Sequence, residues 1–364
     1  MIIGGGVIGT AISLALAERG ARVRVLEMRG VGLGATQASA GMLAPYIEGH
    51  GDALLTLGVA ALDLWDGFVA HVSTVSGLPI EYARAGSMQV AHTVTHADHL
   101  ASTVARLRAR GVACEWLDGA EARRREAALS QDIRQALVVP AHGYVHVGQL
   151  MTALERAAVR QGVSFEKTRV RGVTRTATAA RVETDGGSID ASTVVVASGS
   201  WSSALALDGE PTVPVKPIRG QLVELRFPQP PLATVVWGEG CYLVPWRSGA
   251  LLVGATVEDV GFDESSTEAG VRTLVEAAVL AVPACAQERV QQVRVGLRPA
   301  TSDELPIIGR SSALPHVFYA TGHYRNGVLL APLTAQLVAA SLSGPGSGDW
   351  PVEPGLVAPS RLGL

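Results

Sequence analysis

The residues with the clearest chemical potential form a glycine loop near the start of the chain, where residues 4–9 read GGGVIG and fit the pattern G-x-G-x-x-G. The first glycine of such a loop permits a tight turn, the second lets a pyrophosphate approach the backbone, and the third lets a helix pack closely on a strand. The helix that follows offers free amide groups and the positive end of its dipole to phosphates. The loop at residues 4–9 therefore predicts a dinucleotide-binding site.

An acidic residue accompanies the loop. Glu27 ends the next alternating apolar run, eighteen positions after Gly9. A carboxylate at the end of the second strand can accept hydrogen bonds from ribose hydroxyls, and it would repel the 2′-phosphate of NADP. The combination favours NAD or FAD. A glycine turn in an unrelated α/β protein remains the alternative reading of these residues alone.

These residues need secondary structure to position them. Residues 1–3 are predicted to end a strand, 7–19 to form a helix and 22–27 to form a second strand, which makes a βαβ unit with a parallel sheet. The first strand is short, so we expect either that the natural chain starts upstream or that the strand begins at the terminus itself.

The rest of the chain alternates helical and extended patterns. Apolar periodicity predicts helices over 54–75, 97–110, 148–161, 267–282 and 326–342. Short strands are expected over 163–168, 170–176, 180–184 and 189–196, and the strand-rich stretch 221–257 predicts an antiparallel sheet. The charged stretch 121–126 is interpreted as a solvated helix face.

Composition narrows the function classes. The chain has 364 residues, 48% hydrophobic and 17% charged, with a net charge of −3, which is typical of a globular protein and argues against a nucleic-acid partner. Cys114, Cys241 and Cys285 lack metal-ligand spacing, and His142 and His146 have no third ligand near them in sequence, so no metal is expected. Sparse cysteines and the lack of a long uninterrupted apolar run predict a cytoplasmic enzyme without a membrane segment.

Six further segments occur in a characteristic order. They are GATQASAGML at 34–43, VVVASGSWS at 194–202, PIRGQ at 217–221, GLRPATSD at 296–303, PIIG at 306–309 and GHYRNG at 322–327. This ordered set resembles the D-amino-acid oxidase superfamily of FAD-dependent amine oxidoreductases. Within that superfamily it is most similar to the glycine oxidase family, which serves bacterial thiamine biosynthesis.

The resemblance implies an α/β fold of two interleaved domains. A Rossmann-like FAD-binding domain of the glutathione-reductase type, built on a parallel sheet, would comprise residues 1–75, 145–215 and 296–364. A substrate-binding α+β domain with an antiparallel sheet would comprise residues 76–144 and 216–295.

The resemblance also implies which residues hold a non-covalent FAD. Glu27 and Met28 would meet the adenosine ribose, and Val170, Ala197 and Gly199 would lie near the adenosine. The pyrophosphate would be held by Gly4, Gly6, Val7, Ile8 and Gly9. The residues expected along the flavin are Ala35, Thr36, Ala40, Gly41 and Met42, together with His323, Tyr324, Arg325, Asn326, Gly327, Val328 and Leu329.

The loop at 322–327 also has a physical reading. It is bounded by glycines and stands directly before a predicted helix, whose N-terminus would stabilise negative charge at the pyrimidine edge of the flavin. The alternative is an ordinary left-handed turn that Asn326 and Gly327 supply at the start of a helix.

Three residues are candidates for the substrate site. Arg298 lies between an apolar residue and a proline in a chain with few charges, which favours a buried cation, and by resemblance it binds the substrate carboxylate as a bidentate fork. Tyr242 would donate to the same carboxylate; an aromatic residue packing on an edge strand is the alternative. Arg325 would place its backbone near substrate and flavin.

The chain departs from the glycine oxidase pattern at two places. Gly240 stands where that family carries a histidine, and Val257 stands where a larger methionine is expected. Both changes would enlarge or dry the pocket. Cys241 is adjacent to Tyr242, so strand alternation places it on the opposite face of the sheet, where it would pack in the core.

The resemblance implies oxidative deamination of glycine or another small amino acid or amine. The substrate would lose a hydride from its α-carbon without a strong protein base, and the imine would be hydrolysed to a 2-oxo acid, with peroxide formed if oxygen is the acceptor. A D-amino-acid or sarcosine oxidase or dehydrogenase is the alternative enzyme, and a non-catalytic dinucleotide-binding module is the alternative from another class. The acceptor and the oligomeric state, including a homo-oligomer, stay open.

Overall fold

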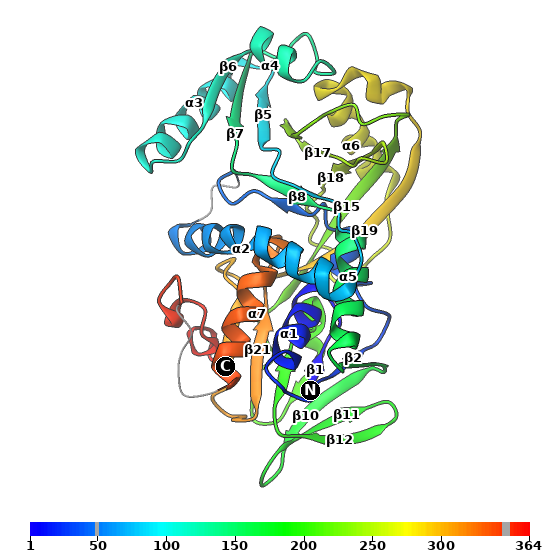
Figure 1. Ribbon diagram of the computed structural model, residues 1–364, viewed down its shortest axis with the longest axis vertical. Helices are drawn as coiled ribbons and strands as arrows, with labels where there is room; N and C mark the ends of the chain where they lie inside the picture. The colour runs from blue at the N-terminus through cyan, green and yellow to red at the C-terminus, as the bar shows by residue number, and fades with distance from the viewer. Residues whose placement is uncertain (48–50, 344–349) are drawn as a thin grey trace.

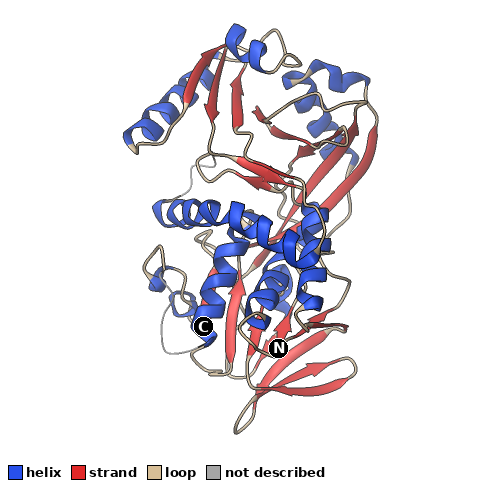
Figure 2. Ribbon diagram, viewed as in Figure 1, coloured by secondary structure: helices blue, strands red, loops and turns tan. Residues whose placement is uncertain are grey.

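The computed structural model describes residues 1–47, 51–343 and 350–364. Two large sheets organise the chain, one in the lower and one in the upper half of Figure 1, and helices cover them as Figure 2 shows. The two longest strands, β15 (Lys216–Arg226) and β19 (Val290–Ala300), pair with each other and run between the two halves. The fold is the α/β architecture expected from the sequence, a parallel-sheet nucleotide-binding domain joined to a largely antiparallel sheet domain.

The nucleotide-binding half is built on a six-stranded sheet. Its neighbours pair in parallel except for the antiparallel edge pair β20–β21. Because parallel strands are buried on both faces, they are continuous apolar runs such as Val194–Val196. In spatial order the strands are β20 (Ile307–Arg310), β21 (Val317–Thr321), β13 (Val194–Val196), β1 (Ile2–Ile3), β2 (Arg24–Glu27) and β9 (Ser164–Lys167).

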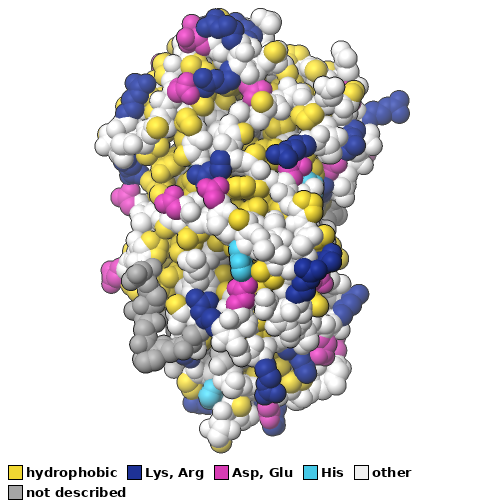
Figure 3. All heavy atoms as spheres, viewed as in Figure 1, with side chains coloured by type: hydrophobic (Ala, Val, Ile, Leu, Met, Phe, Trp, Pro, Cys, Tyr) yellow, Lys and Arg dark blue, Asp and Glu magenta, His cyan; other side chains and the backbone are white. Residues whose placement is uncertain are grey.

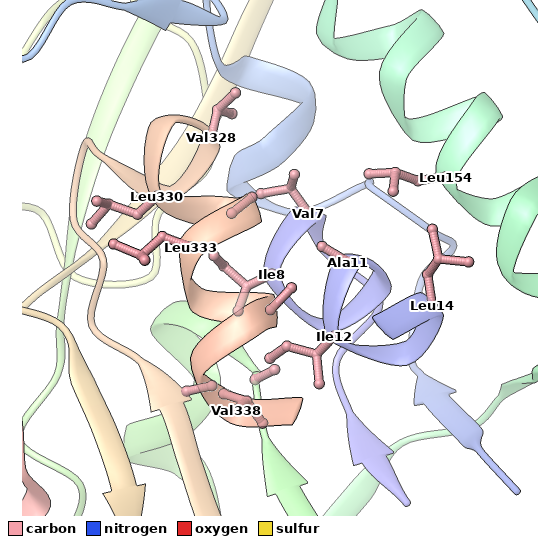
Figure 4. Close-up of a cluster of buried hydrophobic side chains, with 14 of the residues drawn as sticks. Val7, Ile8, Ala11, Ile12, Leu14, Leu154, Val328, Leu330, Leu333 and Val338 are labelled. Atoms are coloured by element: carbon pink, nitrogen blue, oxygen red, sulfur yellow. The ribbon is translucent and has the colours of Figure 1, made fainter. Parts of the chain in front are cut away.

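Four helices form the core of this half. Helix α1 (Val7–Ala17) lies between α7 (Gly327–Ser343) and α5 (Val147–Arg160), and α2 (Asp52–Ser76) lies across them. Figure 4 shows the apolar side chains of α1 between those of α7 and α5. This burial is extensive, because Ala11 and Ile12 are almost fully removed from solvent, so α1 holds the glycine loop rigidly against the sheet.

The other half is an eight-stranded, largely antiparallel sheet in the order β19-β15-β18-β17-β16-β5-β7-β6. One pair, β16–β5, is parallel. Besides β15 and β19, this sheet contains β5 (Ser87–Ala91), β6 (Glu115–Asp118), β7 (Gln135–Val139), β16 (Val235–Gly238), β17 (Cys241–Pro245) and β18 (Ala250–Gly254). The helices in this half are α3 (Val94–Ala109), α4 (Gly119–Arg125) and α6 (Glu268–Ala281).

Two smaller sheets complete the fold. Strands β12 (Gly187–Ala191), β11 (Ala180–Thr184), β10 (Val170–Arg175) and β14 (Ala206–Leu207) form one of them. Strands β3 (Met42–Leu43), β8 (Gly143–Val145) and β4 (Tyr82–Ala83) form the other, which joins the 34–43 segment to residues 82–83 and 143–145. The domain boundaries given above stay a prediction.

Two predicted elements were wrong. The single strand expected over 189–196 is two strands, β12 and β13, which belong to different sheets. The stretch 121–126 is not solvated throughout, because helix α4 ends at Arg125 and Glu126 turns inward. The Glu126 side chain is buried. It accepts hydrogen bonds from the Ala233 amide at 2.9 Å, from the Thr234 amide at 2.8 Å and from the Thr234 hydroxyl at 2.7 Å.

Helix α2 is long and apolar enough, by length and composition alone, to cross a membrane. One face of it is buried in the core, including Leu57 and Trp65, and the Trp65 indole donates to the carbonyl of Leu329 in α7 at 3.0 Å. These contacts are those of a core helix.

On the face of the molecule shown in Figure 3, basic and acidic side chains are interspersed.

Candidate active site

A cavity of about 540 Å³ lies between the glycine loop and the eight-stranded sheet. Segments from both halves line it, including the start of α1, the end of β2, the 34–44 loop, the turn after β13, strands β16–β18 and the start of α7. The cavity therefore joins the predicted nucleotide site to the predicted substrate site.

The glycine loop has the close approaches that its pattern predicts. Gly4 has φ of +105°, and a Cβ there would stand 2.5 Å from the carbonyl oxygen of Ala197, so only glycine fits. A Cβ on Gly9 would stand 2.0 Å from the carbonyl oxygen of Gly4. Gly9 does not line the cavity; it lets α1 pack on the loop, which is the role of the third glycine in the motif.

Glu27 is fixed at the cavity wall by two backbone amides. Its Oε2 accepts from Gly5 at 2.8 Å and its Oε1 accepts from Arg29 at 2.8 Å. A carboxylate oxygen can accept more than one bond, so capacity for ribose hydroxyls is retained. Glu27 thus connects the glycine loop to the end of β2, a function that its position in the sequence does not indicate.

The remaining predicted cofactor residues gather around the same cavity. The Thr36 hydroxyl accepts from the amide of Val7 at 3.1 Å, which pins the short helix η1 (Ala35–Ala38) to the start of α1. The other predicted residues that line the cavity are Gly4, Gly6, Ile8, Met28, Ala35, Ala40, Gly41, Met42, Val170, Ala197, Gly199, His323, Tyr324, Arg325, Asn326, Gly327, Val328 and Leu329.

The loop before α7 takes its turn at different residues from those expected. The positive φ angles are at Gly322 (75°) and Tyr324 (47°), not at the Asn-Gly pair. The Tyr324 amide donates to the carbonyl of Pro299 at 2.9 Å, which holds this loop beside Arg298. His323 is buried with its Nε2 3.0 Å from the Thr334 hydroxyl, and burial lowers the pKa of His323 to about 3, so the ring is neutral.

These features fit FAD. The cradle at Gly4 has no room for a side chain, the amides at the start of α1 can receive a pyrophosphate, and the start of α7 lies at the same cavity. When bound, FAD would be held by the glycine loop and Glu27 at one end and by the 34–42 and 322–329 segments at the other.

Arg298 projects from β19 into the cavity wall. Its Nη1 donates to the carbonyl of Thr256 at 2.9 Å and to that of Arg219 at 3.4 Å. Both of these partners are neutral carbonyls, so they orient the guanidinium without neutralising its charge. The side chain is partly buried, not fully buried as the sequence suggested, because one side of it faces the cavity.

Tyr242 lies on the interior strand β17, so the edge-strand alternative is wrong. It faces Gly254 across the β17–β18 pair, and a Cβ on Gly254 would stand 2.4 Å from the Tyr242 hydroxyl oxygen. The tyrosine ring therefore lies over the glycine, and Tyr242 lines the same cavity as Arg298.

Several residues of the cavity wall were not predicted. Trp237 is the register partner of Tyr242, and their ring centroids lie 5.2 Å apart. At the other end the guanidinium of Arg29 lies 4.3 Å from the centre of the Trp201 ring. Strand pairing could have suggested Trp237 once β16 and β17 were read as a hairpin; Arg29 gives no signal in the sequence.

The two departures from the expected pattern both lie at the cavity. Gly240, in the turn between β16 and β17, and Val257 both line it, and Val257 is 64% exposed. Gly238, Gly254 and Ala255 line the same wall, so much of this region is made of small side chains.

Cys241 is a core residue. Cys241 packs with Leu243 and Val253 in the cluster on the sheet face opposite Tyr242, and burial raises its pKa to about 12. Among the described residues, no group of three or more His, Cys, Asp or Glu side chains could hold a metal ion.

Fold and cavity together define a class of protein: a two-domain, dinucleotide-dependent oxidoreductase whose electron carrier and substrate share one cavity. A family model described as FAD dependent oxidoreductase (DAO) matches residues 1–341. The chain belongs to this family of FAD-dependent oxidoreductases, and it is an enzyme that acts on amino acids in the manner of a glycine oxidase.

Individual relatives support the same placement. The glycine oxidase of Geobacillus kaustophilus is 35% identical over 93% of this chain and 91% of its own, and its crystal structure superposes with a TM-score of 0.89 over 93% of this chain and 92% of that one at 36% identity. The bifunctional protein ThiO/ThiG of Nostoc is 35% identical over 93% of this chain, which spans 52% of that protein. The iminodiacetate oxidase of Chelativorans superposes with a TM-score of 0.89 at 25% identity over 98% of both chains.

Proposed function

We propose that the protein catalyses oxidative deamination of glycine or another small amino acid or amine, giving an imine and then a 2-oxo acid. The observation that carries this proposal is the position of Arg298 and Tyr242 in one wall of the cavity whose far end is the glycine loop. A non-catalytic nucleotide-binding module has no use for a guanidinium held in that place.

The residues of the chain supply binding and orientation. Arg298 binds the substrate carboxylate with the part of its guanidinium that faces the cavity, and the Tyr242 hydroxyl donates to the same carboxylate. FAD, when bound, supplies the electron sink that takes a hydride equivalent from the α-carbon and later reduces an acceptor. The amine must be neutral, and the apolar walls favour that form by excluding water.

The substrate need not be glycine itself. Gly240, Val257 and Ala255 leave space at the cavity wall, which favours a substrate with a small apolar side chain or an N-substituent. For that reason a D-amino-acid or sarcosine oxidase or dehydrogenase is the second candidate. The similarity to the iminodiacetate oxidase of Chelativorans points in the same direction.

We further propose that FAD is bound non-covalently in a cytoplasmic enzyme. The thiol of Cys241, the cysteine adjacent to Tyr242, packs in the core on the opposite sheet face and is kept protonated by its raised pKa. Supply of an imine for thiamine thiazole synthesis is the corresponding physiological role, suggested by the similarity to the bifunctional ThiO/ThiG protein.

Two measurements test the proposal. Purified protein should show a flavin absorption spectrum, and acid precipitation should release all the flavin into the supernatant; flavin that stays with the pellet would contradict non-covalent binding. In a peroxide assay with glycine, sarcosine, D-alanine and iminodiacetate, at least one should be oxidised to its 2-oxo acid, with a dye replacing oxygen if peroxide does not form. Equal oxidation of methylamine, which has no carboxylate, would contradict the amino-acid assignment.

A further inference from the structure

We infer that Glu258, together with Arg219 and Thr256, is a positioning residue that holds Arg298 in place for the substrate carboxylate. This inference rests on the function proposed above. None of these three side chains lines the cavity, so none of them is a contact residue for substrate.

Arg298 is oriented by two backbone carbonyls. The shorter of its two hydrogen bonds goes to the backbone carbonyl of Thr256, at 2.9 Å. Thr256 follows strand β18 and is not part of a described strand, so the β-sheet ladder does not fix its carbonyl. The direction of that carbonyl must therefore be set by other contacts of the residue.

The Thr256 side chain supplies those contacts. Its hydroxyl accepts from the amide of Gln221 at 2.9 Å and donates to Oε1 of Glu258. The amide of Thr256 donates to the carbonyl of Gln221 at 3.2 Å. Thr256 is thus held between the interior strand β15 and a carboxylate two residues further along the chain.

Glu258 is the centre of this network. Its Oε1 also accepts from the side-chain Nε2 of Gln221 at 2.7 Å, and its Oε2 accepts from Nε of Arg219 at 3.1 Å and from Nη2 of the same guanidinium. These partners hold the pKa of Glu258 below its usual range despite burial. A carboxylate with four donors on its two oxygens has a fixed orientation.

Arg219 connects the network to Arg298 by a second route. Its side chain is only 4% exposed, and its backbone exchanges two hydrogen bonds with Glu258, of 2.8 Å and 3.0 Å. The carbonyl of Arg219 is the second acceptor for Arg298. Both carbonyls that orient the substrate-binding guanidinium therefore belong to residues bound to Glu258.

The test compares three variants and one control. Glu258→Gln removes the negative charge and one acceptor oxygen. Thr256→Val removes the hydroxyl and keeps the Arg219–Glu258 ion pair. Thr256→Ser keeps the hydroxyl. Asp259→Asn removes a neighbouring charge that pairs with exposed Lys216, and serves as the matched control. All are measured as FAD-loaded protein.

We expect KM for the best amino acid to rise about ten-fold in Glu258→Gln and Thr256→Val, with kcat within about two-fold, because a misplaced clamp weakens binding of the carboxylate in ground state and transition state alike. The Kd of acetate, followed through the flavin spectrum, should rise in parallel. Thr256→Ser and Asp259→Asn should stay near wild type.

The decisive measurement is made in the Arg298→Ala background. If Glu258 acts through Arg298, adding Glu258→Gln there leaves kcat/KM unchanged. A further ten-fold loss would overturn the inference, as would unchanged KM and acetate Kd in both Glu258→Gln and Thr256→Val. Failure of the proposed function looks different: the wild-type protein would then oxidise no amino acid and would not bind acetate.

Discussion

The guanidinium of Arg298 lies against the α-carbon of Gly220, where a Cβ would stand 2.3 Å from Nη2 and 2.4 Å from Cζ. Gly220 is on β15 and Arg298 on β19, two strands that pair in antiparallel register. The arginine thus occupies the space that any side chain at position 220 would need. The motif PIRGQ, which contains Gly220, therefore contributes to the substrate site through the absence of a side chain.

Replacing Gly220 with alanine should impair substrate binding more than folding. The backbone at Gly220 does not have a positive φ, so alanine causes no backbone strain, but Arg298 must move to admit the methyl group. We expect kcat/KM to fall by about two decades, since a displacement near 1 Å at a positioning group can cost that much. Gly67→Ala, in α2 with open space around it, is the control. Unchanged kinetics in Gly220→Ala would contradict the placement of Arg298.

Removal of the Arg298 side chain tests the carboxylate assignment directly. Arg298→Ala leaves the substrate anion unpaired in a poorly solvated cavity, which costs on the order of 3–5 kcal/mol, or about two to four decades in kcat/KM. Arg298→Lys should restore little, because an ammonium group cannot reproduce the bidentate fork. Flavin content, measured by absorbance, should stay near wild type in both. If Arg298→Ala retains kcat/KM within a few-fold, a simple amine without a carboxylate becomes the better substrate class.

Glu27 should affect FAD binding through two functions. Its carboxylate holds the amides of Gly5 and Arg29 and is placed to accept from the ribose. We expect Glu27→Gln, and more so Glu27→Arg, to weaken FAD binding by about 1.5–3 kcal/mol, the value of a hydrogen bond to a charged group. Fluorescence titration of the FAD-free protein measures this. An unchanged FAD affinity in both variants would remove Glu27 from the cofactor site.

The sequence predicted those features that local pattern determines. The glycine loop, the helix that follows the loop, and Glu27 are close together in the chain, so their spacing alone predicts the βαβ unit. Period-two alternation placed Cys241 and Tyr242 on opposite faces of β17, as the structure has them.

Features that depend on distant pairing could not be predicted in this way. The β16–β17 hairpin is local, but β16 also pairs with β5, which places Trp237 beside Gln89, a residue far away in the chain. The apolar run around 189–196 divides because its two parts pair in different sheets. Glu126 looks like part of a solvated charge cluster, and only the end of α4 turns it toward the amides of Ala233 and Thr234.

The Arg29–Glu264 pair should slow FAD release. Its two hydrogen bonds, of 2.9 Å and 2.5 Å, join the loop after β2 to the 258–266 segment, over the Trp201 ring at the adenosine end of the cavity. Both side chains are partly exposed, so the pair contributes only about 1 kcal/mol and Glu264→Gln should speed FAD dissociation about five-fold. Raised salt should speed release from wild type and have less effect on the variant. Equal release rates at low salt would show that the pair does not retain the cofactor.

His142 is fully buried, and its burial should make the stability of the protein depend on pH. Its Nε2 accepts from the Tyr46 amide at 3.3 Å, so Nδ1 carries the proton of the neutral ring and donates to the Ser87 hydroxyl at 2.7 Å. Burial, with a smaller effect from the charge of Arg84, lowers the pKa of His142 to about 3.

The sign of the effect follows from proton binding. Between pH 6.5 and 3 the unfolded chain binds a proton at His142 and the folded chain does not. The contribution of neutral His142 to the free energy of unfolding is therefore fully present above pH 6.5 and is lost as the pH falls from 6.5 toward 3. The slope below pH 6 is about 1.4 kcal/mol per pH unit for one such group. His323 adds the same dependence, and so do carboxylates whose pKa is lowered by folding, such as Glu258.

A substitution separates His142 from those other groups. His142→Asn should be less stable than wild type at pH 7, and the difference should shrink as the pH is lowered to 5, because the variant has no proton to gain at this position. His99→Asn, at an exposed site, should follow the wild-type curve. Urea unfolding at pH 5, 6 and 7, with FAD saturating throughout, measures the free energies. A constant difference between wild type and His142→Asn across this range would show that His142 is not held neutral by burial.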